Sequence, residues 1–228
     1  MSAELVAAAR AGLAELADAE KAPQMQRYMK SAMPYRGVAT PARRKLANRL
    51  FRAHPLADVA EFTAVALQLW REATYREERY LAIDLTGHSA YRSWQSPGLL
   101  DLYEEMIVTG AWWDYVDEVA IRRVGPLLRA EPGVLEPILR RWAVDEDHWR
   151  RRTSIICQIG AKSATDTALL TTAIEASIDE PDFFLRKAIG WALRELAKTD
   201  PEWVLAFAGN HGGLSPLSRR EALKHLKN

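Results

Sequence analysis

Apolar residues recur along most of the chain at intervals of three and four positions, which is the spacing of amphipathic helices. No stretch of alternating apolar and polar residues, bounded by turn residues, predicts a strand. The loops between the periodic segments are short, so the connected helices are expected to pack as neighbours. The pattern therefore predicts an all-α protein.

Two local signals mark helix ends. Thr40 followed by Pro41 predicts an N-cap and a proline in the first turn of a helix that Pro55 ends. The stretch from Ser218 to Glu221 has the spacing of a capping box and predicts the start of the last helix. Further helices are predicted at about 56–71, 74–88, 97–109, 111–128, 132–144, 147–161, 164–178 and 182–198.

The sequence also contains an internal repeat. Four similar pentads begin at Arg79, Asp117, Arg152 and Lys187, which lie 38, 35 and 35 positions apart. Four positions before each pentad stands a ring: Tyr75, Trp113, His148 and Phe183. Paired helices with this period are typical of HEAT-like solenoids, although chance similarity among amphipathic helices is the alternative.

In such a solenoid the first members of the pentads would form a row along one surface. Arg79, Arg152 and Lys187 are cations that could follow the phosphates of a nucleic acid. Asp117 is the anion in this row and works against that ligand electrostatically, so we expect it to have a function. Trp191 replaces the isoleucine that ends the other pentads.

The segment AWWDYVD, residues 111–117, carries the candidate chemistry. In a helix Trp113 and Asp117 are four positions apart and share one face, so an indole and a carboxylate emerge together. This pairing suits an aromatic, partly cationic ligand. Trp112 points away from that face and is expected in the core. Asp114 lies in the first turn, where a carboxylate is favoured by the helix dipole.

The composition limits the kinds of partner and of cellular compartment that the sequence predicts. The 228 residues include 31 Lys and Arg and 30 Asp and Glu, so the net charge of +1 argues neither for nor against nucleic acid. Basic and acidic residues gather in different segments, which predicts a basic and an acidic face unless each cluster is simply solvated. The lone Cys157 sits in an apolar run and is expected to be a packed thiol in a reducing compartment.

Other chemistries and locations find little support. The five histidines have no spacing that gathers three ligands, and neither a P-loop nor a G-x-S-x-G motif is present. We therefore expect no metal and no cofactor. The amino-terminal segment has charges every few residues and predicts neither a signal peptide nor a membrane span, so a cytoplasmic protein without membrane contact is expected.

Long motifs in a fixed order resemble the AlkD-type DNA alkylation repair glycosylases, a family built from HEAT-like repeats. They are YMKSAMPYRGVATPARRKL, AWWDYVD, WRRRTSI, FFLRKAIGWALRELAKT and PLSRREALKHLK. In that family the site around the lesion uses the Trp and Asp of WWDxVD, the Arg of WxxR and the Trp of KAIGW. These correspond here to Trp113, Asp117, Arg152 and Trp191, with Tyr28 from the first motif.

The resemblance implies a fold and a reaction. The fold is a right-handed α-solenoid with a concave DNA-binding face, forming one domain over residues 1–228. The reaction is hydrolysis of the N-glycosidic bond of N3- or N7-alkylated purines in double-stranded DNA, by a monomer that does not cleave the strand. Such a protein would be associated with the nucleoid when bound to DNA.

The resemblance also implies roles for single residues. Asp117 is the expected catalytic residue, which stabilises positive charge on the sugar and positions the attacking water. Trp113 and Trp191 would pack on the sugar or the cationic base, and Arg152 would hold a flanking phosphate. Further DNA contacts are expected from Tyr28, Arg151 and Lys187, with packing as the alternative for Tyr28 and solvation as the alternative for Arg151.

The sequence also permits a function of another kind. A HEAT-like repeat protein can be a non-catalytic scaffold that binds DNA or protein, with Asp117 as a surface charge. The fold alone does not distinguish this scaffold from a glycosylase.

Overall fold

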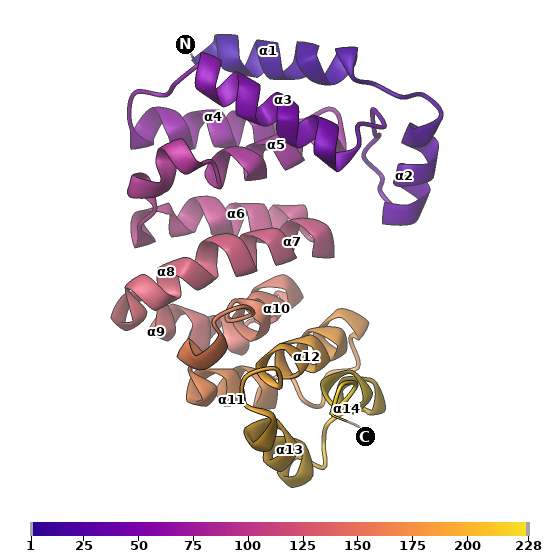
Figure 1. Ribbon diagram of the computed structural model, residues 1–228, viewed down its shortest axis with the longest axis vertical. Coiled ribbons are helices and arrows are strands. Elements are labelled where there is room, and N and C mark those ends of the chain that lie inside the picture. Colours follow the sequence, from indigo (N-terminus) through magenta and orange to yellow (C-terminus); the bar gives the residue numbers. More distant parts are fainter. Residues whose placement is uncertain (1, 227–228) are drawn as a thin grey trace. The chain divides into compact units, whose positions relative to one another are not determined.

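The computed structural model describes residues 2–226 and confirms the all-α prediction (Figure 1). Helices and short connections account for all of the chain in this range, and no strand forms within it. Every helix between residues 2 and 226 is too short or too polar to span a lipid bilayer.

The chain divides into two compact units. The first ends at Gln95 and the second begins at Ser96. The single domain over 1–228 stays a prediction, and residues 1 and 227–228 of that range lie outside the described residues. A concave face running through both units likewise stays a prediction.

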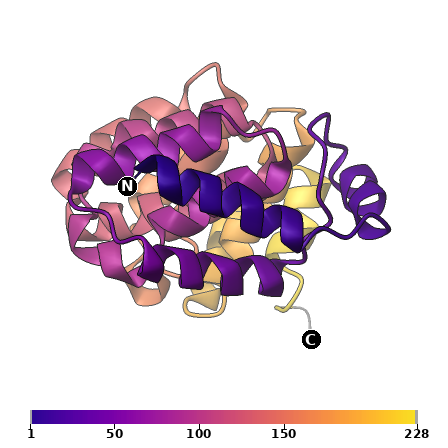
Figure 2. The same ribbon diagram turned by 90° about the horizontal axis from the view of Figure 1, so that it is seen from above.

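The first unit is a small helical bundle. Its helices are α1 (Ser2–Glu15), α2 (Lys21–Met29), α3 (Thr40–Ala53), α4 (Val59–Arg71), α5 (Arg76–Thr86) and the 3₁₀ helix η1 (Ser89–Trp94). Helix α1 packs on α3, α4 and α5, and α5 also packs on α3 and α4. Figure 2 shows α1 and α3 side by side, with α2 standing apart from them.

Residues at helical spacing build the core of the first unit. Leu5 and Leu13 of α1, Phe62 and Leu69 of α4 and Leu81 of α5 are all fully buried. Because each pair within a helix is seven or eight positions apart, both members lie on the same face. The buried faces of these helices therefore follow the apolar periodicity of the sequence.

A buried carboxylate fixes the segment before α3. Glu77 of α5 is fully buried and accepts hydrogen bonds from the backbone N–H groups of Arg36, Gly37 and Val38 at 2.9–3.1 Å. A buried carboxylate is tolerated when several donors satisfy it. Glu77 thus has a structural role in holding the entrance of α3 against α5.

The second unit contains the remaining helices. They are η2 (Pro97–Leu99), α6 (Leu100–Gly110), α7 (Trp113–Val119), the π-helical turn η3 (Ala120–Val124), α8 (Gly125–Ala130), α9 (Pro132–Ala143), α10 (His148–Ile156), η4 (Lys162–Ala164), α11 (Thr167–Glu175), α12 (Phe183–Leu196), α13 (Pro201–Asn210) and α14 (Pro216–Ala222). Helix α10 packs on α6, α7, α9 and α12, and α12 packs extensively on α14.

The predicted repeat is present within the second unit. Trp113, His148 and Phe183 are the first residues of α7, α10 and α12, so Asp117, Arg152 and Lys187 are each the fifth. In the first unit the register differs by one residue. Helix α5 begins at Arg76, so the first pentad starts at its fourth residue.

Two predicted helix starts are wrong. The N-cap of α3 is Ala39, and Thr40 is already its first residue. Helix α14 begins at Pro216 with Ser215 as its N-cap, because the Ser215 hydroxyl accepts a hydrogen bond from the Ser218 N–H at 3.0 Å. A proline favours the first turn of a helix, so Pro216 sets the start and Ser218 falls inside, where it is buried.

Candidate functional site

Asp117 and Arg152 form a buried ion pair between α7 and α10. The Arg152 Nε donates to Asp117 Oδ1 at 2.7 Å, and its Nη2 donates to Oδ2 at 2.8 Å. This is the parallel, two-bond geometry that a guanidinium forms best with a carboxylate. The Arg152 side chain is 5% exposed and that of Asp117 is 15% exposed, so only the carboxylate retains some access to solvent.

The repeat explains why these two residues meet. They occupy the same position in successive repeats, and α7 packs on α10. Equivalent side chains of stacked helices face each other, so the anion of one repeat contacts the cation of the next. The row inferred from the sequence is therefore a direct contact at this step.

A backbone carbonyl completes the surroundings of Arg152. Its Nη1 donates to the Phe184 oxygen of α12 at 2.5 Å, so three of its five N–H donors are engaged. The Phe184 ring packs against Trp112 at 5.3 Å and Trp149 at 5.2 Å between ring centroids. Three helix starts thus share one aromatic cluster, which holds the guanidinium in place.

Trp112 belongs to this cluster rather than to the face of Asp117. It is the N-cap residue of α7, and its ring is half-buried. Its indole Nε1 is buried without a hydrogen-bond partner among the described residues. An unsatisfied buried donor has a free-energy cost, so the edge-on and tilted packing of Trp112 against Phe184 and Trp149 must offset that cost.

Burial and the ion pair shift the pKa of Asp117 in opposite directions. Removal of the carboxylate from water raises its pKa, the hydrogen bond and charge of Arg152 lower it, and the nearby Asp114 raises it again. The net effect is a pKa above the usual aspartate value. Arg152 therefore preserves the ionised form of Asp117 against its own surroundings.

The helix changes its winding directly after Asp117. Residues Ala120–Val124 form a π-helical turn that joins α7 to α8. Gly125 follows, and a Cβ atom there would lie 2.1 Å from the Cys157 carbonyl oxygen, so any larger residue would push α10 away. Single π turns are frequent at functional sites, and here one lies within a turn of the ion pair.

The two predicted aromatic contacts are half-buried. Trp113 lies one helical turn before Asp117 in α7 and shares its face, as the sequence predicted. Trp191 lies one turn after Lys187 in α12 and packs partly on the apolar core of the second unit. Each indole keeps part of its surface available for a ligand.

Arg151 is engaged within the protein. Its Nε donates to Ser177 Oγ at 3.2 Å, its Nη1 to Glu180 Oε1 at 2.8 Å, and its Nη2 to the Ala176 carbonyl. Its side chain is 11% exposed. These contacts tie α10 to the segment after α11, which is a structural role.

Lys187 is also paired. Its ammonium lies 3.1 Å from Glu221 Oε1 of α14, and the same carboxylate contacts Arg194. The close approach of α14 depends on Gly190, where a Cβ atom would lie 2.6 Å from the Glu221 Cβ. The two cations lower the pKa of Glu221, with the Lys187 hydrogen bond as the largest cause.

Tyr28 lies in the first unit, near the end of α2, and is 78% exposed. Its ring is therefore open to a ligand. Lys30, two residues later, has a left-handed backbone with φ of 49°. Tyr28 belongs to a different unit from Asp117, Arg152 and Trp191.

Sequence reasoning missed the acceptors that surround the cations. Glu180 and Glu221 neutralise Arg151 and Lys187, and the Phe184 carbonyl holds Arg152. A backbone acceptor leaves no signal in the residue type. Glu221 had a signal, because the last motif places it among basic residues.

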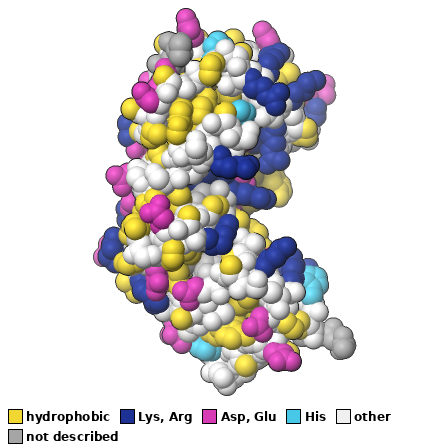
Figure 3. Space-filling view, turned by 60° about the vertical axis from the view of Figure 1, so that its left-hand side comes forward, with side chains coloured by type: hydrophobic (Ala, Val, Ile, Leu, Met, Phe, Trp, Pro, Cys, Tyr) yellow, Lys and Arg dark blue, Asp and Glu magenta, His cyan; other side chains and the backbone are white. Residues whose placement is uncertain are grey.

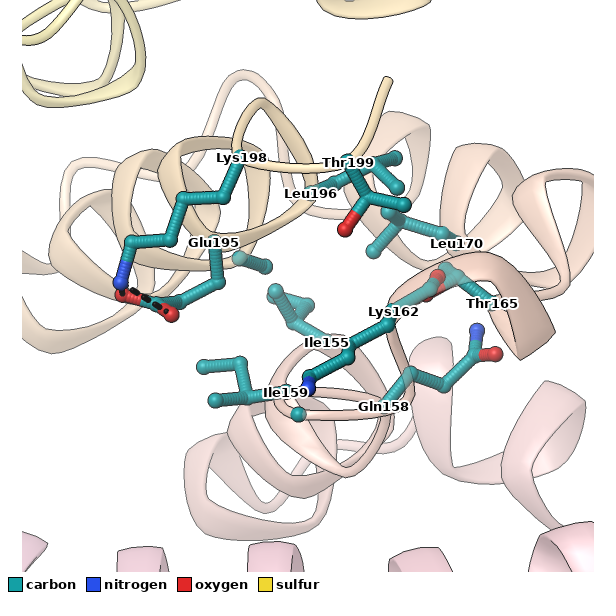
Figure 4. Close-up of a pocket in the computed structure, with 12 residues that line it drawn as sticks. Ile155, Gln158, Ile159, Lys162, Thr165, Leu170, Glu195, Leu196, Lys198 and Thr199 are labelled. Carbon is teal, nitrogen blue, oxygen red and sulfur yellow. Dashed lines mark hydrogen bonds and ion pairs between the residues drawn. The ribbon is translucent and has the colours of Figure 1, made fainter. Parts of the chain in front are cut away.

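A separate pocket of about 390 Å³ lies toward the C-terminal ends of α10 and α12 (Figure 4). Its floor is apolar, and Lys198 at its rim is paired with Glu195 at 2.7 Å. None of the predicted site residues lines this pocket. Its position gives no support to the chemistry inferred from the sequence.

Cys157 is a buried free thiol, as predicted. Burial raises the pKa of its thiol to about 12, so it does not supply a thiolate nucleophile near neutral pH. Among residues 2–226 no group of three or more His, Cys, Asp or Glu side chains is arranged to hold a metal ion.

Several solved structures resemble the chain, including the following three. A predicted DNA alkylation repair enzyme from Enterococcus faecalis has a TM-score of 0.85 and 29% identity, covering 93% of this chain and 97% of its own. The protein smu.31 of Streptococcus mutans UA159 has a TM-score of 0.58 and 17% identity, with 81% and 92% covered. AlkD2 from Streptococcus mutans has a TM-score of 0.58 and 15% identity, with 89% and 96% covered.

No curated protein matches the chain significantly. The model of one family, described as DNA alkylation repair enzyme, matches residues 9–226. That range includes both units and every candidate site residue. Because this match covers far more than half of the chain, the chain belongs to the family of DNA alkylation repair enzymes.

Proposed function

We propose that this protein is a monofunctional DNA glycosylase that hydrolyses the N-glycosidic bond of N3- or N7-alkylated purines in double-stranded DNA. The family gives it a role in alkylation repair and implies DNA as its partner. The observation that carries the proposal is the partly exposed Asp117 carboxylate, held by Arg152 one turn from the half-buried Trp113.

The chemistry requires little help for the leaving group. An alkylated purine carries a positive charge, so the electron pair of the breaking C1′–N bond neutralises the base as it departs. Oxocarbenium character develops on the deoxyribose, as in glycoside hydrolysis. A water oxygen then bonds to C1′, and the proton that it loses passes to the Asp117 carboxylate and on to solvent.

Asp117 suits this role because its orientation is fixed. Arg152 uses one lone-pair position on each carboxylate oxygen, so the remaining positions can face a cation or a water molecule. A preorganised charge aimed at a developing charge is worth about 3 kcal/mol in other enzymes. Arg152 then acts as a positioning residue, which differs from the phosphate contact expected from the sequence.

The indoles of Trp113 and Trp191 offer faces to the sugar or to the cationic base. A favourable cation–π contact contributes about 0.5–2 kcal/mol. Tyr28 is a further candidate for contact with the DNA backbone because it is highly exposed. Arg151 and Lys187 would have to leave Glu180 and Glu221 to bind a phosphate, so we assign them structural roles.

The test uses duplex DNA methylated at N7 of guanine or N3 of adenine, with free base measured over time. The Asp117→Asn variant is expected to release base about 100 to 1,000 times more slowly than the wild-type protein. Asp114→Asn is the matched control, since it removes a neighbouring carboxylate from the same helix and is expected to retain release. Equal release by wild-type protein and Asp117→Asn would contradict the mechanism.

Asp117→Asn also leaves the buried Arg152 without its counter-charge, so loss of activity must be separated from loss of folding. The double variant Asp117→Asn with Arg152→Gln replaces the pair by neutral amides. If circular dichroism shows it folded while release stays lost, the loss comes from the missing ion pair and not from unfolding. If wild-type protein binds the duplex but never frees a base, the chain is a scaffold instead.

A further inference from the structure

Helix α3 carries an unusual concentration of positive charge. Its 14 residues include five cations and no Asp or Glu. Arg43 is buried and pairs with Asp84 of α5, with Nε 2.8 Å from Oδ2. The other four, Arg44, Lys45, Arg49 and Arg52, are exposed, and none of them forms an ion pair within the described part of the chain. We call these four residues the α3 basic face.

This lack of neutralisation sets the α3 basic face apart from the arginines of α10. Arg150 pairs with Glu104 and Asp145, Arg151 with Glu180, and Arg152 with Asp117. Four unpaired cations on one short helix repel each other and raise the local potential. Such a surface is stabilised when an anion binds to it.

The residues follow one side of the helix in successive turns. Arg44 and Lys45 are followed by Asn48 and Arg49, and then by Arg52. With a rise of about 1.5 Å per residue, the α3 basic face extends about 12 Å, which matches the axial rise of three to four phosphates on one DNA strand. Lys45, Asn48, Arg49, Arg52 and Ala53 line a shallow depression on this side.

Asp84 of α5 pairs with Arg43 and with none of the four cations of the α3 basic face. His88 packs against Phe51 of α3, and its pKa is lowered first by burial and then by the positive charge of Arg52. Figure 3 shows Lys and Arg side chains gathered over the upper part of the drawing, where the first unit lies.

A lipid surface fits this face poorly. Peripheral membrane helices insert apolar side chains between their cations. The large apolar residues of α3, such as Leu46, Leu50 and Phe51, are instead buried in the first unit. The exposed side offers charge and the Asn48 amide, which are the groups that bind phosphate oxygens.

We propose that the α3 basic face binds the phosphate backbone of duplex DNA. The first unit would then contribute its own affinity for the substrate, independent of the base sequence. The choice of DNA as the polyanion rests on the proposed function. The binding itself does not depend on Asp117, which belongs to the second unit.

The test measures binding of undamaged duplex DNA by fluorescence anisotropy over a series of salt concentrations. The triple variant Lys45→Gln, Arg49→Gln and Arg52→Gln is expected to reduce the slope of log K against log salt by about 2 to 3, or about one per lost phosphate contact. The matched control is Lys21→Gln, Arg140→Gln and Lys198→Gln, which removes three cations that already have carboxylate partners.

An unchanged slope in the α3 variant, or an equal decrease in the control, overturns the proposal. The proposal is also overturned, in favour of RNA, if the wild-type protein binds single-stranded RNA more tightly than duplex DNA and the α3 variant loses that RNA affinity. If only the proposed function is wrong, the result is different. The wild-type protein then frees no base, but the slope still decreases in the α3 variant.

Discussion

Helices α3 and α10 each contain a run of three consecutive basic residues, yet the structure uses the two runs differently. All three arginines of α10 pair with carboxylates and are at most half-exposed. In α3 only Arg43 is paired, and four cations remain on the surface. The difference lies in the partners, because the acids that neutralise α10 come from other segments of the second unit.

The comparison shows that a cluster of cations has no single meaning in a sequence. Where the fold brings acids to it, the cluster joins helices and, in the proposed mechanism, positions the Asp117 carboxylate. Where the fold brings none, the cluster is available for a polyanion. Removal of a cation should therefore affect folding in α10 and DNA binding in α3.

The largest expected effect comes from Arg152. Arg152→Ala leaves the Asp117 carboxylate buried without its partner, which is expected to lower the free energy of unfolding by about 3 kcal/mol or more. Arg49→Ala in α3 removes an exposed, unpaired side chain and should change it by less than about 0.5 kcal/mol. Chemical denaturation of both variants measures the difference. Equal stability of the two variants would contradict the structural difference between the paired arginines of α10 and the unpaired cations of α3.

A smaller effect is expected at Arg151. Arg151→Ala loses a largely buried set of hydrogen bonds to Ser177, Glu180 and Ala176, so unfolding should become easier by about 1–2 kcal/mol. The salt dependence of DNA binding should not change, because this guanidinium is already occupied. Denaturation and anisotropy titrations on the same preparation check both statements. A flatter salt dependence would place Arg151 on the DNA.

The smallest expected effect is a shift in pH dependence. Asp117 must be ionised to stabilise a cation, so base release falls as the pH drops through its pKa. Burial raises that pKa, so the fall should begin at a higher pH than an exposed aspartate would give. Arg152→Gln removes the charge that opposes burial and should move the fall further upward, while Arg49→Gln should leave it in place. A pH–rate profile of each variant, corrected for spontaneous release, measures the shift.

A profile in which Arg152→Gln and the wild-type protein lose activity at the same pH would contradict the coupling between the two residues. Both profiles must be measured on protein shown to be folded, because the variant lacks the buried ion pair and is less stable.

Much of the fold could be predicted from the sequence because it depends on local periodicity. The buried faces of α1, α4 and α5 follow the apolar spacing, and the helices predicted from about 111, 147 and 182 begin within two residues of those positions. The start of α14 could not be predicted as securely, because Ser215 and Ser218 are both plausible caps. The burial of Ser218 against α12, where its hydroxyl donates to the Arg186 carbonyl, decided between them.

The sequence proposed the members of the candidate site but did not indicate the contacts between them. The motif and the repeat pointed to Asp117, Arg152, Trp113 and Trp191, whose roles stay predictions. They did not indicate that Arg152 binds Asp117, since a phosphate is an equally good partner for a guanidinium. The direct contact arises from the stacking of α7 on α10 and from the Phe184 carbonyl, which is a backbone group.

The sequence by itself determined the all-α class, the 35-residue repeat of the second unit and the positions of an indole and a carboxylate on one helix face. These properties depend on intervals between residues, which a chain carries before it folds. Only the tertiary structure decided which cations are neutralised. An ion pair such as that of Arg152 with Asp117, or its absence around Arg49 and Arg52, depends on which distant segments the packing brings within a few ångströms.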